Sequence, residues 1–159
     1  MSVVAQYLQE WLRHRLVLQE LVEVIPDGHI DFKPWDNAMP MGSLIVHIAS
    51  SMEMFVKTVK NGTFTPPTKI DQYHTIADVR NIVDQLTEET IRELKELNAQ
   101  QLEKEIEFRN FLGTGSFWLS TAKDHEIHHK GQLFTYVRMV GVENVPFMIK
   151  QPPQSKTNV

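Results

Sequence analysis

Cysteine is absent from this chain of 159 residues. Without a thiol, the protein has no disulfide bond, no iron–sulfur cluster, no zinc–thiolate site and no cysteine nucleophile of its own. The seven histidines are therefore the main side chains with an affinity for borderline or soft metal ions. Any metal chemistry of this chain is expected to depend on imidazole.

Long apolar runs and an excess of basic residues are also missing. No stretch reaches the roughly 18 apolar residues of a membrane-spanning helix, and the N-terminal stretch has no signal-like hydrophobic region. The formal net charge is −4, so the composition gives no support for nucleic-acid binding through a basic face. We expect one cytoplasmic domain over residues 1–150 with a flexible tail over residues 151–159, and no contact with nucleic acid or membrane.

Four segments have the apolar spacing of amphipathic helices: residues 3–25, 41–60, 76–97 and 116–140. The connections between them are long: residues 26–40, 61–74 and 98–115. Within the last connection, Glu105–Phe111 alternates enough to form a short extended piece. The pattern predicts an all-α protein with long connecting loops, and such loops free consecutive helices from packing as simple antiparallel neighbours.

Residues at the ends of these segments are typical of helix termini. Asn61 and Gly62 follow the second segment, and Gly141 follows the fourth, as is common at helix C-termini. Thr75 precedes the third segment with Asp78 three residues later, which is close to a capping box. These signals support the predicted helix boundaries.

The segment DHEIHHKGQ, residues 124–132, has the clearest chemical pattern. A helix turns ~100° per residue, so His125 and His129 lie ~40° apart on one face, one turn from each other. Trp118 and Tyr136 lie close to the same direction, so this face is the core-facing one. Burying two imidazoles there costs a few kcal/mol unless a partner satisfies them, and a shared metal ion would do so. His14 has no such partner and is expected to be solvated.

A third histidine, His47, interrupts the apolar start of the second helix, LIVHIA. Its ring also needs a partner on a core-facing surface. If the second and fourth helices face each other, His47, His125 and His129 can hold one divalent ion. Zinc or nickel is the first expectation, and iron, cobalt and copper also suit three imidazoles. The alternative is a bundle without metal, in which the three rings are only hydrogen-bonded.

Three protein ligands leave at least one coordination position open, which is typical of catalytic rather than structural sites. Such an ion lowers the pKa of a bound water or thiol, so we expect a small-molecule substrate. Trp118, Gln132 and Tyr136 are candidates for the pocket lining, although plain core packing explains the aromatic pair equally well. Glu126 is the candidate catalytic base or ligand-orienting group, and a solvated helix position explains it equally well.

The same letters, His125 to His129, also match the H-E-x-x-H pattern of zinc peptidases, in which Glu126 would be the general base. The extended form of that pattern needs a glycine at position 132 and a histidine at position 135, where this chain has Gln132 and Thr135. No histidine follows residue 129 to act as a third ligand. A metallopeptidase is therefore the less favoured alternative.

The chain resembles the DinB/YfiT-like family of metal-dependent four-helix-bundle proteins. The resemblance depends on SLIVHIA in the second helix and HEIHHKGQL in the fourth, with support from Asp31–Pro34 and from the closing YVRMVGVENVPF. It implies an up-down-down-up bundle, commonly a homodimer, with a metal ion on His47, His125 and His129.

The resemblance also gives the expected activities. Relatives of known activity include thiol S-transferases that use low-molecular-weight thiols such as bacillithiol or mycothiol. We therefore expect a metalloenzyme that transfers such a thiol cosubstrate to an electrophile, or one that performs metal-assisted hydrolysis. The alternative is a non-catalytic bundle that binds a metal or a small ligand in a stress response.

The fourth helix also has apolar residues opposite the histidines, namely Ile127, Gly131 and Phe134. A surface helix is normally polar on that side, and a glycine in a helix interior costs about 1 kcal/mol. This face is expected either to pack across a two-fold dimer interface with a close backbone approach at Gly131, or to be buried within one bundle.

Overall fold

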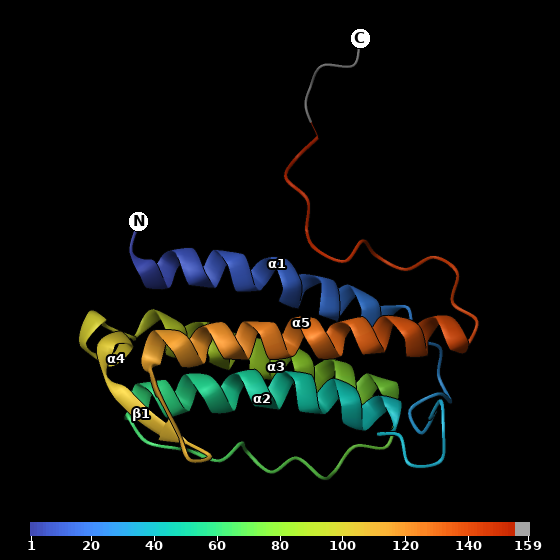
Figure 1. Ribbon diagram of the computed structural model, residues 1–159. Helices are drawn as coiled ribbons and strands as arrows, with labels where there is room; N and C mark the ends of the chain where they lie inside the picture. The colour runs from blue at the N-terminus through green and yellow to red at the C-terminus, as the bar shows by residue number, and fades with distance from the viewer. Residues whose placement is uncertain (155–159) are drawn as a thin grey trace.

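The computed structural model describes residues 1–154, which form a mostly helical protein (Figure 1). Its helices are α1 (Val3–Glu23), α2 (Met41–Asn61), α3 (Ile76–Lys95), the short α4 (Ala99–Glu103) and α5 (Gly115–Met139). The four long helices agree with the four predicted segments to within two residues at each end. The prediction of a helical fold is therefore confirmed, with one small hairpin added.

The predicted end signals have the geometry that they require. Gly62, directly after α2, has a φ of +67°, and its N–H donates to the carbonyl of Thr58. Gly141, close behind α5, has a φ of +95°. Glycine adopts these left-handed conformations without the steric cost that a side chain would add. At the start of α3, Thr75 Oγ1 accepts from the Asp78 N–H at 3.1 Å, and the Asp78 carboxylate accepts from the Thr75 N–H at 2.9 Å.

The predicted extended piece is half of a hairpin. Strands β1 (Glu105–Phe108) and β2 (Phe111–Thr114) pair antiparallel. The two residues between them, Arg109 and Asn110, both have positive φ values, of 49° and 68°. A two-residue hairpin turn favours this backbone conformation, and asparagine tolerates it better than most residues. Ile106 of β1 is buried and joins the apolar core.

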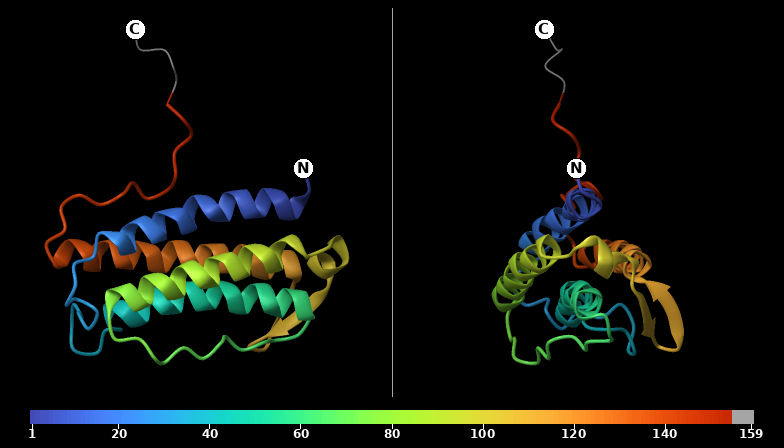
Figure 2. Two further views of the ribbon diagram at one scale, coloured as in Figure 1. Left: turned by 180° about the vertical axis from the view of Figure 1, so that it is seen from behind. Right: turned by 90° about the vertical axis from the view of Figure 1, so that its left-hand side faces the viewer.

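The long helices lie side by side (Figures 1 and 2). In Figure 1, α1 and α5 run from left to right, whereas α2 and α3 run from right to left. Helix α2 packs against α3 and α5, and α1 packs against the same two helices. The apolar faces form two buried clusters, one that includes Leu18, Ile45 and Val137 and one that includes Trp11 and Phe55. The contact between α2 and α5 is the one that the predicted histidine site requires.

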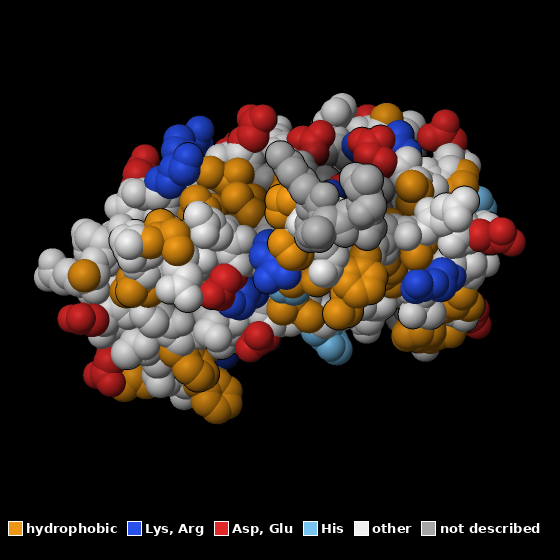
Figure 3. All heavy atoms as spheres, turned by 90° about the horizontal axis from the view of Figure 1, so that it is seen from above, with side chains coloured by type: hydrophobic (Ala, Val, Ile, Leu, Met, Phe, Trp, Pro, Cys, Tyr) orange, Lys and Arg blue, Asp and Glu red, His pale blue; other side chains and the backbone are white. Residues whose placement is uncertain are grey.

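After α5 the chain returns across α1 without regular secondary structure. The Lys150 N–H donates to the Arg13 carbonyl at 3.0 Å, Arg13 Nε donates to the Lys150 carbonyl at 3.1 Å, and the Lys150 ammonium pairs with Glu20. Hydrophobic side chains gather near the middle of the face that carries this segment (Figure 3). The predicted flexible tail begins at residue 151, and its last part, residues 155–159, lies outside the described residues.

None of the helices in residues 1–154 combines the length and the apolar character that crossing a membrane requires.

Candidate metal centre

The structure brings the three predicted ligands together between α2 and α5. His47 and His125 approach each other with their Nε2 atoms 3.1 Å apart. The ring centroids are 4.9 Å apart for His47 and His125, 4.8 Å for His47 and His129, and 4.4 Å for His125 and His129. Each ring offers one nitrogen within 4.8 Å of the other two, so this group can hold a metal ion.

The chemistry of this donor set suits a divalent transition metal. Three nitrogens that bind one tetrahedral zinc ion at 2.0–2.1 Å lie about 3.3 Å from one another. The His47–His125 separation of 3.1 Å is already close to that value. All three side chains are half-buried, so they are partly shielded from water. The residues present therefore fit the ion that the sequence analysis predicts.

Two of the rings are oriented by neighbours on their own helix. Ser51 Oγ lies 3.4 Å from His47 Nδ1, one turn along α2. Gln132 Oε1 lies 2.6 Å from His129 Nδ1, one turn along α5. When Nδ1 donates to such an oxygen, the lone pair is left on Nε2, the nitrogen that would bind the metal. The Gln132 oxygen can only accept, so it favours the His129 tautomer with the proton on Nδ1, and the Ser51 hydroxyl contacts the outer nitrogen of the His47 ring.

Two of the three imidazoles, His47 and His125, favour the neutral form. Burial, with smaller effects from the neighbouring His129 and His47, lowers the pKa of His125 from 6.5 to about 4. Burial also lowers the pKa of His47, with a smaller effect from His129. Only the neutral ring has a lone pair for a metal ion. Both rings are therefore ready to act as ligands at pH 7.

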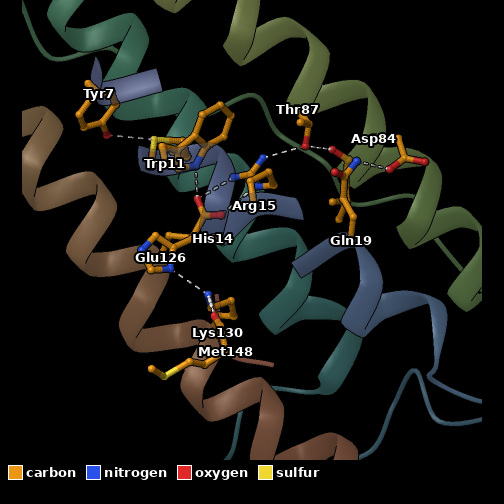
Figure 4. A network of polar contacts seen from close by, with 12 residues as sticks. Tyr7, Trp11, His14, Arg15, Gln19, Asp84, Thr87, Glu126, Lys130 and Met148 are labelled. Carbon is orange, nitrogen blue, oxygen red and sulfur yellow. Dashed lines mark hydrogen bonds and ion pairs between the residues drawn. The ribbon is translucent and has the colours of Figure 1, made fainter. Parts of the chain in front are cut away.

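Glu126 does not take the role that the sequence suggested. Its side chain is almost fully buried and accepts from Arg15 Nε at 2.8 Å, from Arg15 Nη2 at 2.9 Å and from Trp11 Nε1 at 2.8 Å (Figure 4). Arg15 Nη1 also donates to Thr87 Oγ1 at 3.0 Å, which ties α3 into the same network. Both carboxylate oxygens are occupied by partners from α1. Glu126 is neither a solvated residue nor a base placed beside the histidines, and the peptidase alternative loses its general base.

Of the three predicted pocket-lining residues, only Gln132 contacts one of the histidines. Gln132 contacts the site through His129. Trp118 is buried and donates to the carbonyl of Ile106 at 2.9 Å, while Tyr136 is buried and donates to the carbonyl of Met39 at 3.0 Å. Trp118 thus holds strand β1 against the bundle, and Tyr136 holds the loop before α2. Their contacts match the core-packing alternative of the sequence analysis.

Sequence reasoning missed a buried polar cluster on the other side of α5. Lys130 is 3% exposed, and its Nζ donates to His14 Nδ1 at 3.0 Å and to the Met148 carbonyl (Figure 4). Burial lowers the pKa of Lys130 to about 8. His14 is half-buried and contacts Lys130, so the expectation of a solvated His14 was wrong. Burial and then the charge of Lys130 lower the pKa of His14 to about 4. Lys130 follows Glu126 by one helical turn, and this spacing is the sequence signal that could have indicated the cluster.

The apolar back face of α5 also differs from the sequence expectation. A Cβ placed on Gly131 would meet no atom within 4 Å, and Ile127 is 38% exposed. No element within residues 1–154 therefore makes the expected close approach at this glycine, and the alternative of burial within one bundle is wrong. Phe134 is buried, however, so this face borders a cavity rather than a flat surface.

Comparison with known proteins places these features in a family. A model of the DinB family matches residues 1–157. The protein YjoA of Bacillus subtilis is 37% identical over 145 residues, which cover 89% of this chain and 94% of YjoA.

Solved structures agree with the sequence comparison. The crystal structure of the DinB-like YjoA superposes with a TM-score of 0.83 at 34% identity, covering 92% of this chain and 99% of that one. A DinB-like protein from Bacillus cereus gives a TM-score of 0.77 at 19% identity, with coverages of 90% and 95%. A structure from Exiguobacterium sibiricum gives 0.72 at 17% identity, with coverages of 93% and 99%. At these lower identities the likeness concerns the fold alone.

Proposed function

The chain belongs to the DinB family, and from this premise we propose that it is a divalent-metal-binding enzyme built on an up-down-down-up four-helix bundle. The observation that carries the proposal is the convergence of His47, His125 and His129, whose ligand atoms all lie within 4.8 Å of one another. These residues come from helices far apart in the sequence. Three imidazoles are a favourable donor set for zinc or nickel.

A divalent ion held by three protein ligands keeps at least one coordination position for a small molecule. When bound, a divalent ion supplies Lewis acidity, which lowers the pKa of a water or thiol that reaches it. The chain's own contribution is orientation: Ser51 and Gln132 hold the outer nitrogens of two rings. The half-buried rings also limit the access of bulk water, which strengthens electrostatic interactions at the site.

Among the possible reactions, thiol transfer fits the residues better than hydrolysis. Glu126, the carboxylate expected to serve as a base, is bound to Arg15 instead. A thiol has an ordinary pKa of about 8.5, far below that of water, so it needs less assistance to lose its proton. The chain has no cysteine, so the thiol must come from a low-molecular-weight cosubstrate.

The reaction can be tested with an electrophile whose thiol conjugate is easily measured. Chlorodinitrobenzene is incubated with the zinc- or nickel-loaded protein and with glutathione, cysteine, bacillithiol or mycothiol in turn. The sulfur forms a bond to the ring carbon, chloride leaves with the bonding electrons, and the thiol proton goes to solvent. We expect metal-dependent product with at least one thiol, and its loss in His125→Ala.

His128→Ala is the matched control, because it removes an exposed histidine from the same helix and leaves the three ligands in place. This variant should keep the activity. Bound metal without any metal-dependent product across the panel would favour the alternative, a non-catalytic metal- or ligand-binding bundle. A protein that binds no metal would contradict the whole proposal.

A further inference from the structure

A cavity lies on the opposite side of α5 from the three histidines. Its volume is about 330 Å³, and it is lined by His14 of α1, by Ile127, Lys130, Gly131 and Phe134 of α5, and by Met148 and Ile149 of the C-terminal segment. The size is at the lower end of the range for small-molecule sites. Apart from His14 and Lys130, the lining is formed by apolar side chains and a glycine. The cavity corresponds to the back face that the sequence marked as unusually apolar.

Lys130, which lines this cavity, has a buried ammonium group without a counter-ion among residues 1–154. Lys130 is 3% exposed, and within residues 1–154 its Nζ contacts only neutral partners, His14 Nδ1 and the Met148 carbonyl. The nearby Glu126 is engaged on both oxygens by Arg15 and Trp11. A buried cation normally has a paired anion. An ammonium group has three N–H donors, so one donor remains for a ligand.

We propose that this cavity binds a monocarboxylate with a short unbranched apolar chain, its carboxylate on Lys130 and its chain against Ile127, Phe134 and Met148. The charges next to this cavity support an anion: Arg15 and Lys130 contribute two positive charges and Glu126 one negative charge, and the other buried carboxylate, Glu53, pairs with Lys57 on α2. A carboxylate supplies one negative charge, whereas a doubly charged phosphate would overcompensate and would cost more to desolvate.

Gly131 supports the same assignment. It lies in the middle of α5, where glycine lowers helix stability, and a Cβ at this position would face open space. The backbone of α5 is therefore open to the cavity at this point, so an apolar chain can lie against it. The Met148–Lys150 segment, held on α1 by Arg13, forms the opposite wall.

The test is calorimetric titration of the full-length, chelator-treated protein with octanoate, using butyrate and octanol as comparison ligands. We expect octanoate to bind with one site per chain, butyrate more weakly because it buries less apolar surface, and octanol more weakly because it lacks the charge. Lys130→Met should weaken octanoate binding at least about tenfold. Lys69→Met, which removes a lysine that is 87% exposed, should leave it unchanged.

A second variant keeps the proposal testable should Lys130→Met fail to fold. Gly131→Leu places a side chain in the cavity from an ordinary helical position, so it should block octanoate while raising the melting temperature. His47→Ala should bind octanoate as well as the wild type does, which separates this cavity from the metal centre.

Three results would overturn the proposal. The first is equal binding of octanol and octanoate, and the second is unchanged octanoate binding in Lys130→Met. The third is a dimer in sedimentation velocity that Gly131→Leu dissociates, with no octanoate bound, because the face would then be an interface between two copies.

Discussion

The buried pair of Glu126 and Arg15 offers the sharpest mutational test of the structure. Replacing Glu126 with alanine removes the carboxylate and leaves the guanidinium in a position where it is 0% exposed. It also leaves Trp11 Nε1 without its acceptor. The sequence pattern alone would have made Glu126 a surface or catalytic residue, and both of those roles predict a stable variant. The structure predicts a large loss of stability.

The magnitude follows from the burial of both partners. Removing one member of a buried ion pair costs about 3–5 kcal/mol, because the remaining charge has no compensation. The unpaired Trp11 N–H adds about 1–3 kcal/mol to this cost. Most domains have only about 5–15 kcal/mol of total stability. We therefore expect Glu126→Ala to lose at least about 3 kcal/mol and to be only marginally folded at 25 °C.

Urea unfolding followed by far-UV circular dichroism measures this change. The double variant Glu126→Leu with Arg15→Met removes both charges and should recover most of the loss, since apolar replacements of buried ion pairs are often neutral. A double-mutant cycle should give a coupling energy of at least about 2 kcal/mol. A Glu126→Ala protein that keeps wild-type stability but loses activity would refute this reasoning and restore Glu126 as a catalytic group.

Three further predictions concern other parts of the chain. Ser51→Ala and Gln132→Ala should each weaken metal affinity about 10–100-fold, because each removes a contact that orients a ligand ring. Competition with a chromogenic chelator measures this affinity, and unchanged affinity in both variants would argue against their role. Gly131→Ala should raise the free energy of unfolding by about 1 kcal/mol, and a loss of stability would show that something occupies the space beside this residue. The metal-free protein should lose stability as pH falls from 6.5 toward about 4, because the folded state keeps His125 neutral while the unfolded chain takes up a proton. In His125→Gln the urea midpoint of unfolding should change less with pH over this range. An equally steep change of the midpoint in that variant would contradict the prediction.

Much of the fold could be predicted from local sequence. Apolar spacing gave the four long helices, and their ends carry local signals such as the Thr75–Asp78 capping box and Gly62. The pairing of His125 with His129 follows from helix geometry alone. His47 could be added because a polar ring among apolar neighbours needs a partner. In each case the information lies within one helix.

The partners of Glu126 and Lys130 could not be predicted in this way. Each position on α5 turns ~100° from the one before, so Glu126 points away from His125, and what it meets depends on how α1 packs. Arg15 is 111 residues away in the sequence, and nothing local in either helix specifies their contact. The cavity beside Lys130 likewise depends on the path of residues 148–150 over α1.

The most direct test of the metal centre is the metal content of untagged protein, measured by inductively coupled plasma mass spectrometry before and after saturation with zinc or nickel. We predict close to one ion per chain in the wild type and in His128→Ala, and a loss of stoichiometric binding in His47→Ala, His125→Ala and His129→Ala. The variant at His47 is decisive, because only the contact between α2 and α5 joins it to the other two. An ion bound equally well without His47, or no ion taken up by the wild type, would contradict the central claim.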